Sequence, residues 1–208
     1  MVTNKCNCSL FSVIIKSMKI WRVVRIHKFL IWVMVLALAL AIGFGYFAKK
    51  FTTNVKKISE AEGSVYFEKA RKAQEEGDLQ KAKELYEKAL QAGDNEAYLE
   101  KYAQVSYGLQ QFDDSIESYT KLLKQRQDSA STWNSIGNVY RDNGNSDKAI
   151  ESYQKAIATD SHYIVAYTNL INLYLLQANN EKAKEVLEQG LKANPNDANL
   201  AGIRKNIK

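Results

Sequence analysis

Few side chains in this sequence have a type and spacing that could support catalysis. His27 and His162 are the only histidines and lie far apart, and Cys6 and Cys8 form a C-x-C pair with no further His or Cys nearby to complete a metal site. A lipidated or redox-active cysteine in that pair is the alternative. There is no Gly-rich phosphate loop and no nucleophile elbow. The sequence therefore predicts a non-catalytic protein without a metal or cofactor.

Asparagines are the polar residues whose placement most needs an explanation. Asn134 and Asn138 lie in one stretch with helical spacing, and Asn169 and Asn172 lie in another. Asparagine is a poor helix former, so four in two predicted helices require a reason. A side-chain amide donates and accepts hydrogen bonds together, which suits holding the backbone of an extended peptide. These residues indicate a binding surface for peptide.

Two predicted helices in residues 130–163 position the first pair of asparagines. Apolar residues at i, i+3, i+7 mark one face of the first helix, and residues at i, i+4, i+7 mark one face of the second. The first helix holds Trp133, Ile136 and Tyr140, and the second holds Ala149, Tyr153 and Ala156. Residues 143–146 (NGNS) interrupt the pattern and predict the turn, with Asn145 or Ser146 as N-cap. Small residues on the facing sides, such as Gly137, predict a close approach of the two helices.

This pattern recurs with a fixed period in both directions along the chain. Residues equivalent to Ala149 and to Tyr153 follow one another in steps of 33, 34 and 34 residues. The two series are Ala82, Ser115, Ala149, Ala183 and Tyr86, Tyr119, Tyr153, Leu187. A period of this length indicates a solenoid. We predict four repeats at 63–95, 96–129, 130–163 and 164–197, followed by a capping helix at 198–208.

The repeats resemble the tetratricopeptide repeat, whose pattern is W-x2-L-G-x2-Y followed by Ala, an aromatic residue and Ala. Residues 130–163 match at the positions named above, and Gly137 occupies the glycine place. The fourth repeat has the family's proline, Pro195, whereas Ser161 replaces it in the third. The resemblance covers about 63–197 and implies an all-α, right-handed solenoid of helix pairs that acts as a non-catalytic scaffold for protein interaction.

The resemblance also implies that the first helix of each pair lines a concave groove. Eight candidate groove residues follow from it, together with Tyr107: Arg71, Lys101, Gln104, Asn134, Asn138, Arg141, Asn169 and Asn172. Asparagine is ordinary for the family at three of these places, which is the alternative explanation for them. Some family members hold a C-terminal carboxylate with a clamp of basic residues and asparagines. The basic partners of such a clamp are missing here, so we do not expect that mode of binding.

The basic charge is confined to the N-terminal part of the chain. Residues 1–62 contain ten Lys or Arg and two Glu, whereas residues 63–208 contain nineteen Lys or Arg and twenty-one Asp or Glu. A protein that binds nucleic acid needs its basic surface on the folded domain. We therefore expect a protein or peptide partner and no nucleic acid.

A membrane anchor is the other prediction from the N-terminal part. Phe29–Ala48 is twenty residues long and uncharged, which suffices to span the ~30 Å hydrocarbon core of a bilayer. We predict a single transmembrane helix there, after a basic tail at 1–28 and before a helical stalk at 49–62. The alternative is a cleaved signal peptide, because Ala39-Leu40-Ala41 matches an A-x-A site and Met18 would provide a conventional start.

The short basic tail is difficult to translocate, so we expect the tail in the cytoplasm and the repeats on the extracytoplasmic side. These predictions together describe a membrane-anchored scaffold that binds a peptide segment or partner protein during assembly of an envelope complex. The alternative is the same fold facing the cytoplasm, as a membrane adaptor or targeting receptor.

Overall fold

The computed structural model describes residues 32–34, 46–126 and 129–206, and divides the chain into two compact units, residues 1–58 and 59–208. In the first unit, residues 32–34 and 46–58 are helical. The hydroxyl groups of Thr52 and Thr53 donate to the carbonyl oxygen of Lys49 at 2.9 and 2.8 Å. Throughout the described residues, the regular secondary structure is helical.

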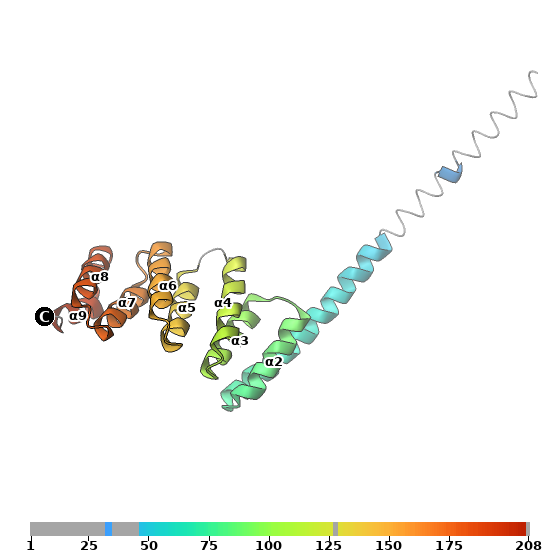
Figure 1. Ribbon diagram of the computed structural model, residues 1–208. Coiled ribbons are helices and arrows are strands. Elements are labelled where there is room, and N and C mark those ends of the chain that lie inside the picture. Colours follow the sequence, from blue (N-terminus) through green and yellow to red (C-terminus); the bar gives the residue numbers. More distant parts are fainter. Residues whose placement is uncertain (1–31, 35–45, 127–128, 207–208) are drawn as a thin grey trace, which may run out of the picture. The chain divides into compact units, whose positions relative to one another are not determined.

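The second unit is a row of antiparallel helix pairs closed by one further helix (Figure 1). It begins with a helical segment at residues 59–75. The helices that follow are α2 (Leu79–Ala92), α3 (Glu96–Gly108), α4 (Phe112–Arg126), α5 (Ala130–Asp142), α6 (Ser146–Thr159), α7 (Ile164–Leu176), α8 (Asn180–Ala193) and α9 (Ala198–Asn206). From α2 onward each helix contacts the next, and α5 also contacts α7. The prediction of an all-α solenoid of helix pairs is confirmed.

Each helix pair has the same backbone turn between its two helices. One residue in each turn has a positive φ: Gly77 (83°), Gln110 (59°), Gly144 (78°) and Ala178 (55°). The next residue donates its N–H to a carbonyl oxygen five residues earlier, in the last turn of the first helix. These bonds are Asp78 to Ala73 (2.9 Å), Gln111 to Ser106 (2.8 Å), Asn145 to Tyr140 (2.8 Å) and Asn179 to Tyr174 (2.9 Å).

The residue after this positive-φ position caps the second helix with its side chain in three of the four pairs. The side chains of Asp78, Asn145 and Asn179 accept from the N–H group three residues later, at 3.1, 3.2 and 3.1 Å. Asn145 is therefore the N-cap of α6, as one of the two predicted alternatives had it. Asp197 caps α9 in the same way, because its Oδ1 accepts from the N–H of Leu200 at 2.8 Å. Such a cap stabilises a helix by about 1 kcal/mol.

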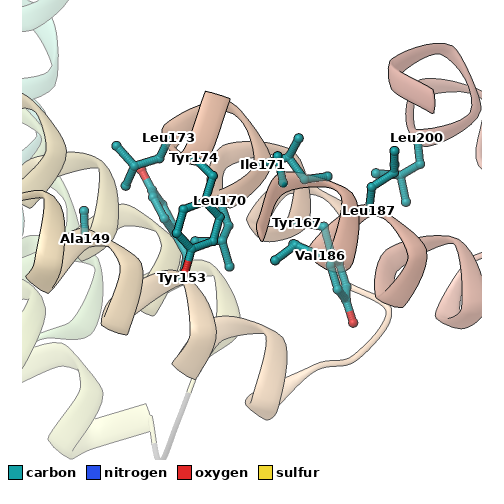
Figure 2. Packing of buried hydrophobic residues seen from close by; sticks show 11 residues of the cluster. Ala149, Tyr153, Tyr167, Leu170, Ile171, Leu173, Tyr174, Val186, Leu187 and Leu200 are labelled. Atoms are coloured by element: carbon teal, nitrogen blue, oxygen red, sulfur yellow. The ribbon is translucent and has the colours of Figure 1, made fainter. Parts of the chain in front are cut away.

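The periodic small and aromatic residues form the core. Ala82, Ser115, Ala149 and Ala183 are completely buried, and the equivalent Tyr86 and Tyr153 are as well. A Cβ atom at Gly137 would lie 2.5 Å from Cε1 of Tyr153, so glycine is what lets α5 and α6 come this close. Figure 2 shows how Tyr153 and the residues of the fourth repeat continue this packing from α6 toward α9. The predicted role of the small residues is confirmed at this position.

Helix α9 covers the apolar edge that the fourth repeat would otherwise expose. Leu200 is completely buried and Ile203 is partly buried against the same cluster. A Cβ atom on Gly190 would lie 3.1 Å from both Leu200 and Tyr167, so α8 and α9 also pack closely. Burial of one leucine side chain contributes about 2 kcal/mol.

The predicted single-pass localisation is corrected by the structure. Residues 29–31 and 35–45 of the predicted span lie outside the described residues. Among the helices that the structure does describe, none combines the length and the apolar composition that a membrane crossing requires. The described helical residues 46–58, for example, include Lys49, Lys50, Lys56 and Lys57. The described structure therefore does not support the predicted N-in, C-out single-pass localisation.

Candidate functional site

All eight predicted groove residues lie on the first helices of the pairs. Arg71 is in the segment 59–75, Lys101 and Gln104 are on α3, and the other five are on α5 and α7. Because α5 and α7 are in direct contact, their polar side chains can meet. The structure brings these residues together in two groups and leaves two of them apart.

The first group joins three asparagines from neighbouring repeats. The Asn169 side-chain Nδ2 donates to Asn134 Oδ1 at 2.8 Å and to Asn138 Oδ1 at 3.2 Å. Asn134 is only 5% exposed, which is unusual for a polar residue without charge. We call these three residues the asparagine network. It crosses from α5 to α7 and so joins the third repeat to the fourth.

The core of the third repeat holds the asparagine network in place. The hydroxyl group of Tyr153 donates to Asn138 Oδ1 at 2.7 Å, while its ring packs against Gly137. Burial raises the pKa of Tyr153 to about 12, so the hydroxyl keeps its proton at neutral pH and remains a donor. The apolar spacing of the second helix predicts only a core position for Tyr153. Its hydroxyl group is a supporting contact that the apolar periodicity could not reveal.

Several amide atoms in this region have no partner among the described residues. They are Asn134 Nδ2, Asn138 Nδ2 and Asn169 Oδ1. None of these three atoms is completely buried. Asn172, one turn further along α7, is exposed and makes no side-chain hydrogen bond within the described chain. The face therefore presents a donor on Asn138, an acceptor on Asn169 and the free amide of Asn172, while the Asn134 donor is nearly buried. This is the pattern that an extended backbone can pair with.

The second group lies in the first two repeats and is bound to its own neighbours. Arg71 pairs with Glu68 (3.3 Å) and Glu75 (3.6 Å), and Lys101 donates to Gln104 Oε1 at 3.1 Å. Arg71 and Lys101 line one hollow of about 360 Å³. These half-exposed ion pairs contribute little to stability, typically below about 1 kcal/mol.

The described hydrogen bonds of Arg141 include none to the asparagine network, and its Nε donates to the Asp142 carboxylate at 2.7 Å. The hydroxyl group of Tyr107, on α3, donates to the same carboxylate and joins the second repeat to the third. The Arg141 and Tyr107 hydrogen bonds hold the pKa of Asp142 below its ordinary value. No motif in the sequence marks Asp142, because a carboxylate next to an arginine on one helix is common.

The other residues considered for chemistry are two cysteines and two histidines. Cys6, Cys8 and His27 lie outside the described residues. His162 lies in the turn before α7, and its side chain is exposed. Its backbone N–H donates to Asp160 Oδ1 at 2.9 Å. His162 is thus an exposed turn residue.

Stacked helix pairs with one repeated turn and one repeated core define a helical solenoid of the kind that presents a surface to other proteins. Three family models, each for the tetratricopeptide repeat, match residues 140–207, 103–164 and 63–92. The chain belongs to the tetratricopeptide repeat family. Family and fold are in general non-catalytic modules for protein interaction. No curated protein sequence matches the chain.

Solved structures with the same fold include three of interest. The MamA protein is 27% identical, with a TM-score of 0.56 over 64% of this chain and 74% of its own. YrrB, described as a TPR protein with an unusual peptide-binding site, is 20% identical, with a TM-score of 0.57 over 69% and 74%. A tetratricopeptide repeat protein from Parabacteroides merdae is 19% identical, with a TM-score of 0.59 over 67% and 56%. At these identities, the similarity to YrrB and to the Parabacteroides merdae protein shows a shared fold.

Proposed function

We propose that the face formed by α5 and α7 binds an extended peptide segment of a partner protein, and that the chain acts as a non-catalytic interaction scaffold. The observation that supports this most directly is the asparagine network, whose unpaired donors and acceptor stand at fixed positions. The described peptide-binding site of YrrB, on the same fold, adds support by analogy.

Preorganisation is the physical reason to expect useful affinity. Ordering a free side chain at an interface costs about 0.5–1.5 kcal/mol, and the network has ordered Asn134, Asn138 and Asn169 before a ligand arrives. Each hydrogen bond to a peptide backbone then contributes about 1 kcal/mol net. Backbone recognition also predicts weak dependence on peptide sequence at these positions. The near-neutral charge of residues 63–208 fits the prediction of a peptide rather than a nucleic acid.

The test uses peptides selected from a random library on the full chain, with their dissociation constants measured by fluorescence anisotropy. Asn172→Ala and Asn169→Ala should each weaken binding about five- to ten-fold, which corresponds to one lost hydrogen bond. Asn180→Ala is the matched control, because Asn180 is also exposed but begins the second helix α8. Its effect should stay below about two-fold.

Methylating single peptide nitrogens distinguishes backbone recognition from side-chain recognition. One peptide N–H is expected to donate to the asparagine network. When that nitrogen is methylated, the unaltered chain and the Asn169→Ala variant should bind the peptide with equal affinity. Equal binding by the chain and both asparagine variants would show that peptides bind elsewhere.

A further inference from the structure

The second helices carry a hollow that the proposed function does not use. It measures about 400 Å³ and lies between α2 and α4, with α3 as its floor. Its lining residues are Glu87, Leu90, Gln91, Asp94, Leu99, Tyr102, Asp114, Glu117, Ser118 and Lys121. Leu99 and Tyr102 precede Lys101 and Gln104 by two residues, or about 200° around α3. The α2–α4 hollow therefore lies on another side of the solenoid from the candidate peptide face.

The charge of this hollow is specific to its position. An equivalent hollow of about 400 Å³ lies between α6 and α8 and contains one carboxylate, Glu185, and one amine, Lys182. The α2–α4 hollow contains four carboxylates and one amine. Because the two hollows have the same architecture and volume, the excess of negative charge arises from the residues and not from the fold.

Two of the four carboxylates make no ion pair with the residues that the structure describes. Glu117 pairs with Lys121 at 2.7 Å and Asp114 with Lys83 at 2.6 Å. Among the described residues, no cation lies within 4 Å of the carboxylates of Glu87 or Asp94, and Glu87 only accepts from the Tyr102 hydroxyl at 3.5 Å. A hollow that has more carboxylates than amines beside apolar walls attracts a cation that also has an apolar part.

A largely buried serine that lines the hollow provides an independent indication of a ligand. Ser118 lines the hollow and is 5% exposed, yet within the described chain its hydroxyl makes no hydrogen bond. The equivalent Ser152 of the next repeat donates to the carbonyl oxygen of Lys148 at 2.7 Å. A buried polar side chain normally has a partner. Ser118 can accept one from an ammonium group in the hollow.

We propose that the α2–α4 hollow binds a lysine side chain of a basic peptide segment in a partner protein. The ammonium group would lie at Glu87 and Asp94, within reach of Ser118. The methylene groups of its stem would lie along Leu90 and Leu99, one partly and one fully buried. This site is independent of the asparagine network, so either proposal can fail without the other.

The experiment measures binding of a fluorescein-labelled peptide, Gly-Ala-Lys-Leu-Lys-Ala-amide, to the full chain by fluorescence anisotropy at low ionic strength. Glu87→Gln with Asp94→Asn should weaken binding at least about five-fold, because both unpaired carboxylates are replaced by isosteric amides. Glu151→Gln with Glu185→Gln removes the same charge from the second helices of the next repeats, and should change binding less than about two-fold. Asn169→Ala should leave this peptide's affinity unchanged.

A second peptide separates the lysine site from general charge attraction. Replacing both lysines by 2,4-diaminobutyrate keeps the charge and shortens the stem, so the apolar contact with Leu90 and Leu99 is lost. Weaker binding of this peptide to the chain, and equal binding of both peptides to the Glu87→Gln, Asp94→Asn variant, would support the site. Equal binding of both peptides to the unaltered chain, or equal losses in the two double variants, would overturn it.

Discussion

Repeats two and three, residues 96–129 and 130–163, form the same helix pair with different residues in the turn. In repeat three, Gly144 provides the positive φ without steric cost and Asn145 caps α6. In repeat two, Gln110 adopts the same φ region, and the Oε1 atom of Gln111 is buried without a partner among the described residues. Repeat two therefore has this geometry despite its local sequence, because the neighbouring repeats impose it.

The cores of the two repeats differ in a related way. Where repeat three has Tyr140, repeat two has Ser106, which is fully buried and whose hydroxyl group lacks a partner in the described part of the chain. Ser115 replaces the alanine at position 149 but donates to the Ala103 carbonyl oxygen at 2.9 Å. One buried serine is thus satisfied and the other is not. Substitutions in repeat two can therefore raise the free energy of unfolding, whereas substitutions at the equivalent positions of repeat three should lower it.

The largest change in stability is expected when Gly137 of repeat three is replaced by alanine, the residue that repeat two has at the equivalent position. Gly137→Ala places a Cβ atom 2.5 Å from the buried Tyr153 ring, whereas repeat two has Ala103 at this position. We expect a loss of about 3 kcal/mol in the free energy of unfolding, measured by urea denaturation with circular dichroism. Gly202→Ala is the control, since a Cβ there meets no atom within 4 Å. A silent Gly137→Ala would show that α5 and α6 are packed less closely than described.

A smaller effect is expected when repeat two receives the cap of repeat three. Gln111→Asn should add an N-cap to α4 and remove the buried unpaired oxygen, raising the free energy of unfolding by about 1 kcal/mol. The converse change, Asn145→Ala, should lower it by a similar amount. Thermal unfolding of both variants checks the pair. Stabilisation by the first without destabilisation by the second would contradict the capping explanation.

The positive-φ position offers a third exchange between the repeats. Gln110→Gly should stabilise the chain by about 0.5–1 kcal/mol, because only glycine adopts φ near 60° without steric cost. Ala178→Gly should do the same in repeat four, and Gly144→Ala the opposite in repeat three. Denaturant midpoints at constant slope would measure the three changes. Similar midpoints for all three would mean that the turns relax around the substitution.

The smallest effect concerns the bond between the two repeats. The pKa of Asp142 is lowered by Arg141 and Tyr107, so the stabilisation is fully present above the unfolded value near pH 4 and is lost as pH falls through the folded value. Asp142→Asn should cost no more than about 1 kcal/mol at pH 7, because the pair is partly exposed. The difference from the unaltered chain should vanish once the pH has fallen below the folded pKa of Asp142. A difference that persists there would assign the effect to packing.

The periodic features of the fold could be predicted from the sequence, whereas the site contacts could not. Burial repeats every 33 or 34 residues, so Ala149, Tyr153 and their equivalents indicate the helix pairs directly. The Asn169–Asn134 bond depends on how α7 rotates against α5, which local spacing does not determine. Hydropathy alone suggested a membrane crossing at 29–48, and the described helices do not provide one. The excess charge of the α2–α4 hollow combines residues from α2, from the turn after it and from α4, and therefore has no local signal.

Tyr153 has a consequence for anyone who wishes to move this binding surface to another scaffold. One end of the side chain is in the core against Gly137, and the other end orients Asn138. Copying the asparagines onto an unrelated helix pair would transfer the amides without the residue that aims them. A transplant has to include the glycine and the tyrosine together with the asparagines, because the unit that can be inherited or designed is the whole helix pair and not its surface.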